Sequence, residues 1–488
     1  MKRFAALLAL TMFAACASAP PERRLIDDAA AALGGADRLT SLRTLVIEAT
    51  GTAPNAGQNR MPDDDLPVWR INEYTRTIDL ANRRLRMKQV REAQFLFAGD
   101  LIQRQEQGLD GDVAYNIGVS GTATRATEAA ARDRRVELLH HPVTAVRAAL
   151  DPASMLTNRR SDGDDELVDI TTASGDAVTL AVDRQTFLPT RVMSMAANPN
   201  MGDVAVVTRF DDYEDVSGVK LPRRLTTTMD KYVQLDLNVS RNRVNAEVGD
   251  VSAPESVRSA PVPTPPPVVV TAEPVGRGIW WLAGSGNHRS IVFEFADHLV
   301  LFEVPLNEAR TRAVIEKART LSTKPLTTAI VSHHHFDHSG GLRAAVAEGL
   351  QIVTHRANEA FFKDLLARPH TIVPDALQKN PREASFVFVD DQLTLKDSAM
   401  EVQLYHLLDN PREGTNLFAY VPAQRILVQA DLYDSTWQRH SWGANVLENI
   451  GRRGLKVDRH VPVHGAIEPF AQMVATIKAR PGNGPAAD

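Results

Sequence analysis

Four histidines and an aspartate stand close together in SHHHFDHSGG, residues 332–341. His333, His335, Asp337 and His338 form the pattern H-x-H-x-D-H. Imidazole nitrogens and carboxylate oxygens are common zinc ligands, and a tight loop can direct several of them to one point. The stretch therefore predicts a metal site, with a solvated polar turn as the alternative.

The segments on either side place this stretch at the end of a strand. TTAIV, which precedes it, is apolar and β-branched, as is typical of a buried strand, and LRAAVAEG after it is typical of a helix. Loops at strand ends often carry functional groups. Two more potential ligands also follow short apolar strands, because Asp431 comes after ILVQA and His464 after HVPV.

Together these residues resemble the motifs of the metallo-β-lactamase superfamily of metal-dependent hydrolases, over residues 270–478. In that family the first two histidines of the motif bind one metal, and its aspartate and last histidine bind a second. The later aspartate bridges both metals, and the final histidine completes the second site. The metal ligands that the resemblance implies are His333, His335, Asp337, His338, Asp431 and His464. The expected cofactor is zinc, as one or two ions.

One position departs from this pattern. The resemblance implies a third histidine on the first metal where this chain has Arg412, nineteen residues before Asp431. A guanidinium stays protonated, offers no lone pair and repels a divalent cation. We therefore expect a weakened first site. The alternative is that His406, six residues before Arg412, replaces the missing ligand.

The chemistry expected of the second site is hydrolysis. A zinc ion lowers the pKa of bound water towards neutrality and so creates a hydroxide nucleophile. Asp337 would orient it, and Arg412 would hold a substrate carboxylate, a phosphate or a developing oxyanion, so these two are the expected catalytic residues. The substrate would be an ester, lactone, amide or phosphoester. The fold does not choose among these substrates, because one fold hosts many chemistries. The alternative is a degenerate envelope protein that binds a metal or ligand without turnover.

A proline-rich segment divides the chain. Residues 24–258 alternate apolar and polar side chains in several stretches, such as YVQLDLNVSRNRV, and predict a mostly antiparallel β domain. Residues 259–270 contain APVPTPPPVVV, which is typical of a stiff linker. Strands and helices then alternate through residues 271–478. The expected fold combines α+β and α/β: an αβ/βα metallo-β-lactamase sandwich that follows a β-rich N-terminal domain.

The first residues are typical of an export signal. Lys2 and Arg3 precede the apolar run FAALLALTMFAA, so residues 1–19 read as a signal peptide. Cys16, the single cysteine, resembles the lipidated residue of a bacterial lipoprotein, although Phe13 stands where leucine is usual. Ordinary cleavage nearby is the alternative. Either way we expect an exported protein without a disulfide, in the periplasm or anchored to the outer membrane of a bacterium.

The composition limits the possible partners. Hydrophobic residues make up 43% and charged residues 24% of the 488 residues, as in a globular protein. The net charge is −5 and no long basic tract occurs, which argues against nucleic acid as a partner. We expect a small-molecule substrate, and membrane contact only through a lipid anchor.

Replacing Arg412 by histidine should raise the metal content of the purified protein towards about two ions per chain, because imidazole supplies the missing donor. Plasma mass spectrometry of protein purified without chelators measures this. An unchanged metal content would contradict the weakened first site. A collapse of turnover in the same variant would assign Arg412 a catalytic role.

Overall fold

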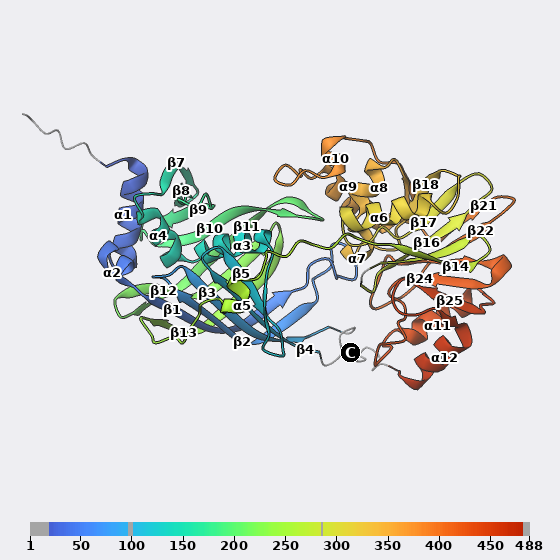
Figure 1. Ribbon diagram of the computed structural model, residues 1–488, viewed down its shortest axis with the longest axis horizontal. Helices are drawn as coiled ribbons and strands as arrows, with labels where there is room; N and C mark the ends of the chain where they lie inside the picture. Colours follow the sequence, from blue (N-terminus) through green and yellow to red (C-terminus); the bar gives the residue numbers. More distant parts are fainter. Residues whose placement is uncertain (1–18, 96–100, 285, 482–488) are drawn as a thin grey trace, which may run out of the picture.

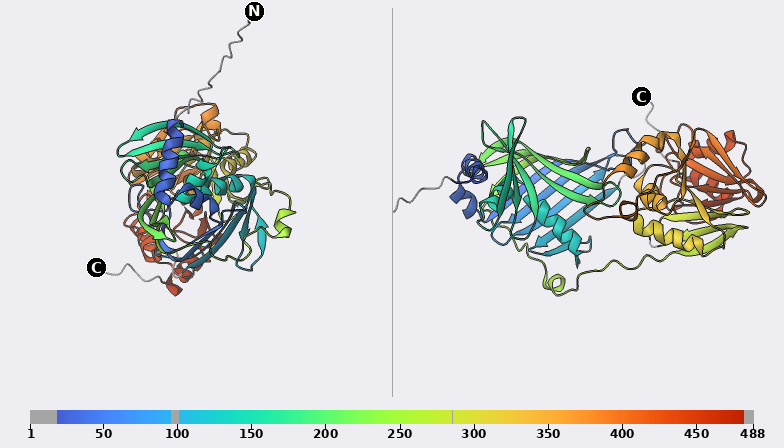
Figure 2. Two further views of the ribbon diagram at one scale, coloured as in Figure 1. Left: turned by 90° about the vertical axis from the view of Figure 1, so that its left-hand side faces the viewer. Right: turned by 90° about the horizontal axis from the view of Figure 1, so that it is seen from above.

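The computed structural model describes residues 19–95, 101–284 and 286–481. They form two lobes that follow one another along the long axis of the molecule (Figure 1). Residues 259–270 connect the lobes without forming a helix or strand, and they run along one side of the molecule (Figure 2). The expected signal segment with Phe13 and Cys16 lies outside the described residues, apart from Ala19.

A curved sheet of 13 strands forms the first lobe (Figure 2). Two meanders, β1–β6 and β7–β13, meet where β1 pairs antiparallel with β13. Buried and accessible residues alternate along parts of several strands, for example β2, as expected when one face covers a core. The strands are β1 (Thr44–Pro54), β2 (Val68–Asp79), β3 (Arg84–Ala93), β4 (Ile102–Asp110), β5 (Val113–Ile117), β6 (Ala123–Arg125), β7 (Met155–Asp162), β8 (Asp165–Thr171), β9 (Ala177–Asp183), β10 (Pro189–Asn198), β11 (Gly202–Val216), β12 (Val219–Met229) and β13 (Tyr232–Val244).

Helices pack onto this sheet through one large apolar core. Leu25 of α1 and Val146 of α4 belong to the same buried cluster as Leu180 of β9. Thr127 caps α3 by accepting a hydrogen bond from the backbone of Ala130, as N-cap residues do. The helices of this core are α1 (Pro21–Leu33), α2 (Ala36–Ser41), α3 (Glu128–Leu139) and α4 (Pro142–Leu150), whereas α5 (Glu255–Arg258) packs through a separate small cluster with Tyr115.

Two smaller sheets form the second lobe. Strands β17 to β20 of the first pair in parallel, as do β24 and β25 of the second, while the other neighbours are antiparallel. The seven-stranded sheet contains β14 (Thr271–Gly276), β15 (Ile279–Ala283), β16 (Arg289–Glu294), β17 (Leu299–Phe302), β18 (Leu326–Ile330), β19 (Gln351–His355) and β20 (Phe386–Val389). The six-stranded sheet contains β21 (Gln392–Lys396), β22 (Glu401–His406), β23 (Leu417–Val421), β24 (Ile426–Gln429), β25 (Arg459–Pro462) and β26 (Glu468–Pro469).

Three apolar clusters hold this lobe together. Phe302 and Val428 belong to the cluster formed by both sheets. Val314 of α6 belongs to a cluster with the seven-stranded sheet, and Val446 of α11 to one with the six-stranded sheet. The helices are α6 (Glu308–Arg319), α7 (Phe336–Ser339), α8 (Leu342–Ala347), α9 (Glu359–Ala367), α10 (Ala376–Lys379), α11 (Gly443–Arg452) and α12 (Phe470–Ala479).

The described chain is thus built largely of antiparallel strands with a smaller number of helices. Alternation of apolar and polar residues predicted such strands before residue 258. Among the described residues, no helix has the length and apolar character needed to cross a membrane.

Two buried histidines should make the first lobe sensitive to acid. Burial, together with the charge of Arg76, lowers the pKa of His140 from 6.5 to about 4 and that of His141 from 6.5 to about 3. As the pH falls below 6.5, the unfolded chain therefore binds protons that the folded lobe excludes. The free energy of unfolding should then decrease by up to about 1.4 kcal/mol per pH unit for each histidine.

The variant His141→Asn tests this dependence. Nδ1 of His141 accepts a hydrogen bond from the backbone of Val143 at the start of α4, and asparagine can replace it as a cap without titrating. Between pH 6.5 and pH 4, the Tm of this variant should fall less steeply than that of the wild type. Equal slopes in thermal unfolding would contradict the prediction.

Candidate metal centre

The histidine-rich stretch lies at the carboxyl end of β18, in the parallel part of its sheet. The chain turns there into α7 and then α8. His333, His335 and His338 are completely buried, whereas the side chain of Asp337 is 24% exposed. Solvent therefore reaches this stretch on the side of Asp337.

The other two predicted ligands come from the six-stranded sheet. Asp431 follows β24 and His464 follows β25, which are adjacent parallel strands. The carboxyl ends of parallel neighbours meet at one edge of a sheet. Both side chains consequently point to the same place, where they meet the stretch from the other sheet.

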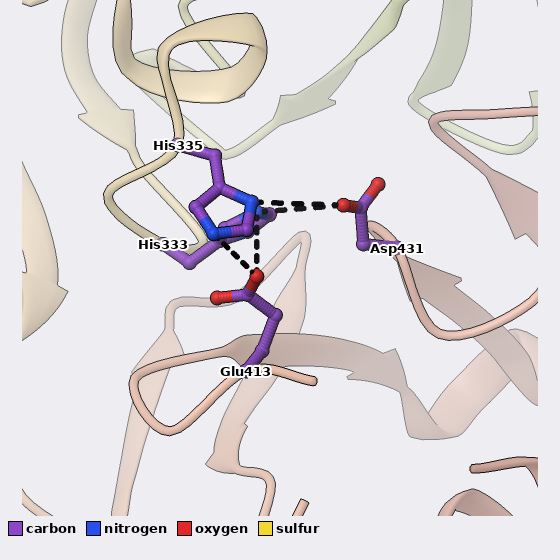
Figure 3. A group of neighbouring side chains, drawn as sticks. All are labelled: His333, His335, Glu413 and Asp431. Atoms are coloured by element: carbon purple, nitrogen blue, oxygen red, sulfur yellow. Dashed lines mark ion pairs between the residues drawn. The ribbon is translucent and has the colours of Figure 1, made fainter. Parts of the chain in front are cut away.

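Two groups of potential ligand atoms share Asp431. In each group the donor atoms lie within 4.8 Å of one another. The first group is His333, His335, Glu413 and Asp431, and the second is Asp337, His338, Asp431 and His464. Figure 3 shows the first group, with both imidazoles between the carboxylates of Glu413 and Asp431. The structure thus brings all the predicted metal residues together and adds Glu413, which the sequence did not single out.

In the second group, ring nitrogens and carboxylate oxygens face one another closely. Nε2 of His338 lies 3.1 Å from Oδ1 of Asp431 and 3.3 Å from Oδ2 of Asp337. Nε2 of His464 lies 3.0 Å from Oδ1 of Asp431 and 3.1 Å from Nε2 of His338. These distances suit donors that share one cation.

The outer nitrogens of both rings have other partners. Nδ1 of His338 donates to Oε2 of Glu303 at 2.8 Å, and Nδ1 of His464 donates to the carbonyl of Asn287. A carbonyl can only accept, so a proton of His464 lies on Nδ1, and its Nε2 faces the group. Such outer hydrogen bonds orient metal-binding imidazoles.

The first group contains buried polar atoms that lack hydrogen bonds. Among the described residues, Nε2 of His333 and Oε2 of Glu413 have no hydrogen-bond partner, whereas Oε1 of Glu413 pairs with Nε2 of His335 at 2.7 Å. His333 Nε2 lies 3.7 Å from Oδ2 of Asp431 and 3.9 Å from Oε1 of Glu413. Buried polar groups without partners are costly, and a metal ion would satisfy these. The donor set therefore fits a metal.

Arg412 competes for the same atoms. Its Nη2 lies 3.2 Å from Oδ2 of Asp431 and 3.4 Å from Nδ1 of His335, and its side chain is only 6% exposed. A fixed positive charge at these distances opposes a cation in the first group. Glu413, the next residue, offsets this repulsion because its carboxylate adds a negative charge to the first group. The first group therefore consists of potential metal ligands with the guanidinium of Arg412 beside them.

His406, the alternative ligand, lies in neither group. Its Nε2 donates to the carbonyl of Gly414 at 2.9 Å, and its ring centre lies 4.0 Å from that of His355. It therefore supports the segment that carries Arg412 and Glu413.

Two residues of the site have a backbone conformation that is unusual outside glycine. Asp431 has φ of 60° and Glu303, which follows β17, has φ of 78°. Such left-handed residues cost about 1–3 kcal/mol each and persist where surrounding contacts hold them. For Glu303 these contacts are the backbone N–H of Ser332 at 3.0 Å and His338. No motif marked Glu303, because its partners lie about thirty residues further along.

The electrostatics follow from burial and pairing. Burial alone would lower the pKa of His338, but the carboxylates of Asp337, Asp431 and Glu303 raise it well above its ordinary value. Burial would raise the pKa of Asp431, yet His338 and hydrogen bonds hold it well below its usual range. Burial raises the pKa of Glu413. A metal that binds here has to displace protons, so its binding depends on pH.

Comparisons with known proteins find similarity only among solved structures. No family model and no curated protein matches the sequence. A metallo-beta-lactamase from Pontibacter korlensis is 16% identical and covers 43% of this chain and 97% of its own, with a TM-score of 0.35. One from Hirschia baltica has 16% identity, covers 44% and 100%, and has a TM-score of 0.35. A mono-zinc form from Pseudomonas aeruginosa has 17% identity, covers 44% and 96%, and has a TM-score of 0.35.

The wild-type chain should hold about one zinc ion tightly, in the second group. His464→Gln should lose most of it, whereas Glu413→Gln should keep it, because Glu413 belongs only to the first group. Plasma mass spectrometry after dialysis against zinc-free buffer measures the difference. His406→Gln, outside both groups, is the matched control. Two tightly bound ions per wild-type chain, or none, would contradict this assignment.

Proposed function

We propose that the chain is a metal-dependent hydrolase of the metallo-β-lactamase superfamily, with its active site in the second lobe. The observation that supports this most directly is the convergence of Asp337, His338, Asp431 and His464 from two sheets. The helices and the two facing sheets of this lobe are compatible with the αβ/βα sandwich of that superfamily.

Zinc suits this set of imidazoles and carboxylates. When bound, the metal supplies Lewis acidity that activates water and polarises the reacting bond of the substrate. The chain supplies the geometry, because Glu303 and the carbonyl of Asn287 fix the rings of His338 and His464. Asp337, the most exposed of these groups, faces the solvent from which water and substrate arrive.

Arg412 is the residue that would set the substrate preference of the active site. Its guanidinium stays charged and lies 3.2 Å from Asp431, the residue that both groups share. It can hold a carboxylate or phosphate of the substrate, or an oxyanion that develops during hydrolysis. We therefore propose an ester, lactone, amide or phosphoester substrate that carries or develops negative charge next to the reacting atom.

A second candidate function is metal or ligand binding without turnover. It is favoured by the contact of Arg412 with two potential ligand atoms, since such a cation weakens the first group. The two functions differ in whether the zinc-loaded protein turns over any substrate.

Zinc-loaded protein should hydrolyse an anionic member of a panel of esters, lactones, amides and phosphoesters. Arg412→Met should lower kcat/KM by about 10²-fold, because one charged stabiliser of the transition state is lost, while zinc in the second group remains. Arg425→Met is the matched control, since Arg425 is an exposed arginine paired with Asp458. Absence of turnover across the panel by zinc-loaded wild type would exclude the hydrolase and leave the binding function.

A further inference from the structure

A loop of the first lobe reaches the metal centre of the second. Residues 55–67, the β1–β2 loop, leave the curved sheet and lie against the second lobe close to α7 (Figure 1). Gly57, at φ of +71°, lies so close to Phe336 that an added Cβ would be 2.5 Å from its ring. Only glycine combines this backbone with this approach, so the loop is shaped to fit the histidine-rich stretch.

Gln58 in this loop bridges Arg412, which lies beside the first group, and Asp337 of the second group. Its Oε1 accepts a hydrogen bond from Nη2 of Arg412 at 2.6 Å, and its Nε2 donates to Oδ1 of Asp337 at 3.1 Å. A guanidinium only donates and a carboxylate only accepts, so one orientation of the amide satisfies both partners. A single side chain therefore fixes how Arg412 and Asp337 lie relative to each other.

The next residue acts on a predicted ligand directly. The carbonyl of Asn59 accepts a hydrogen bond from Nε2 of His335 at 2.8 Å. This places a proton on Nε2, which also lies 2.7 Å from Oε1 of Glu413, and leaves Nδ1 of His335 facing Oδ2 of Asp431, 3.9 Å away. The first lobe thus supplies the outer hydrogen bond that orients an imidazole ligand.

The same loop also holds the segment that carries Arg412. The carbonyl of Arg60 accepts from the backbone N–H of Gly414 at 3.0 Å, and Nε of Arg60 donates to the carbonyl of Asn410 at 3.2 Å. Contacts thus lie on both sides of Arg412, in addition to the bond from Gln58.

A second junction fixes the lobes relative to each other, away from the loop. Asp203 at the start of β11 accepts from the backbone and hydroxyl of Thr371, at 2.8 and 2.6 Å. Arg368 pairs with Asp230 at 2.8 Å. Met201 belongs to an apolar cluster of the second lobe. This junction holds the first lobe against the second, and so keeps the β1–β2 loop next to the metal centre.

We propose that the β1–β2 loop is part of the active site and that Gln58 is its positioning residue, which holds Arg412 and Asp337 for a substrate between them. This inference rests on the proposed function, because those two residues are the ones proposed to face substrate. It gives the first lobe a role in the reaction. Any effect of lobe docking on metal affinity is then matched by an equal effect of the metal on docking, because coupling between two binding events is reciprocal.

Substitutions of Gln58 separate positioning from simple contact. Gln58→Leu keeps the volume and removes both hydrogen bonds, while Gln58→Glu keeps the bond to Arg412 and repels Asp337. Gln58→Leu should lower kcat by about tenfold or more and change KM less, because the groups remain but are misplaced. Gln185→Leu is the control, since Gln185 is an exposed glutamine at a turn of the first lobe.

Cobalt(II) binding gives a readout that does not need turnover. The Gln58→Leu variant should bind Co²⁺ about tenfold more weakly and show a shifted visible absorption spectrum, because Asp337 loses the hydrogen bond that orients it. Hydrogen exchange should show that Co²⁺ protects residues 55–67 in the wild type, and less so in the variant. Should Gln58→Leu fail to unfold cooperatively, Gln58→Asn, which is one methylene shorter, should show the same changes at smaller size.

The outcomes distinguish the inference from the proposed function. Wild-type Co²⁺ binding without turnover of any substrate would remove the hydrolase, while the spectrum and exchange of Gln58→Leu would still decide the role of the loop. A folded Gln58→Leu with the Co²⁺ affinity, spectrum and kcat of the wild type would overturn the inference. Absence of Co²⁺ binding by the wild type would overturn both.

Discussion

The buried carboxylate of Asp431 is the constraint on which the rest of the site depends. Its Oδ1 faces His338 and His464 at 3.1 and 3.0 Å, and its Oδ2 faces Arg412 at 3.2 Å. A buried charge is stable only when positive groups or hydrogen bonds surround it. Burial of this carboxylate also requires that strand ends from both sheets meet here, because no single loop carries enough donors. The arrangement of the second lobe therefore follows from one carboxylate that several cations share.

That constraint explains the strained backbone around the site. Asp431 and Glu303 both adopt left-handed φ angles, and both carboxylates hydrogen-bond to His338. The imidazole thus lies between two acids, one on each ring nitrogen. The outer acid orients the ring, and the inner acid faces the ring nitrogen that would bind a metal in the second group. Strain in the two backbones is offset by contacts that only this geometry allows.

Sequence patterns could predict candidate ligands that follow strands, because apolar strands and the polar residues after them are local features. His338, Asp431 and His464 were predicted in this way, and the structure brings them together. The sequence did not indicate Glu413, because the spacing from Asp431 leads to Arg412 and cannot show that the next residue in the turn also points into the site. Gln58 could not be found, since it precedes its partner Asp337 by 279 residues, and only the docking of the lobes joins them.

Arg412 connects these observations. A guanidinium needs no cofactor to carry its charge, so the chain itself supplies positive charge where a second metal would otherwise be required. Such a charge helps only if it is held at a fixed distance from Asp431, because a free arginine would turn towards solvent. The bond from Gln58 and the contacts of Arg60 on either side provide that restraint. The first lobe therefore holds the guanidinium of Arg412 beside Asp431, next to the first group of potential metal ligands.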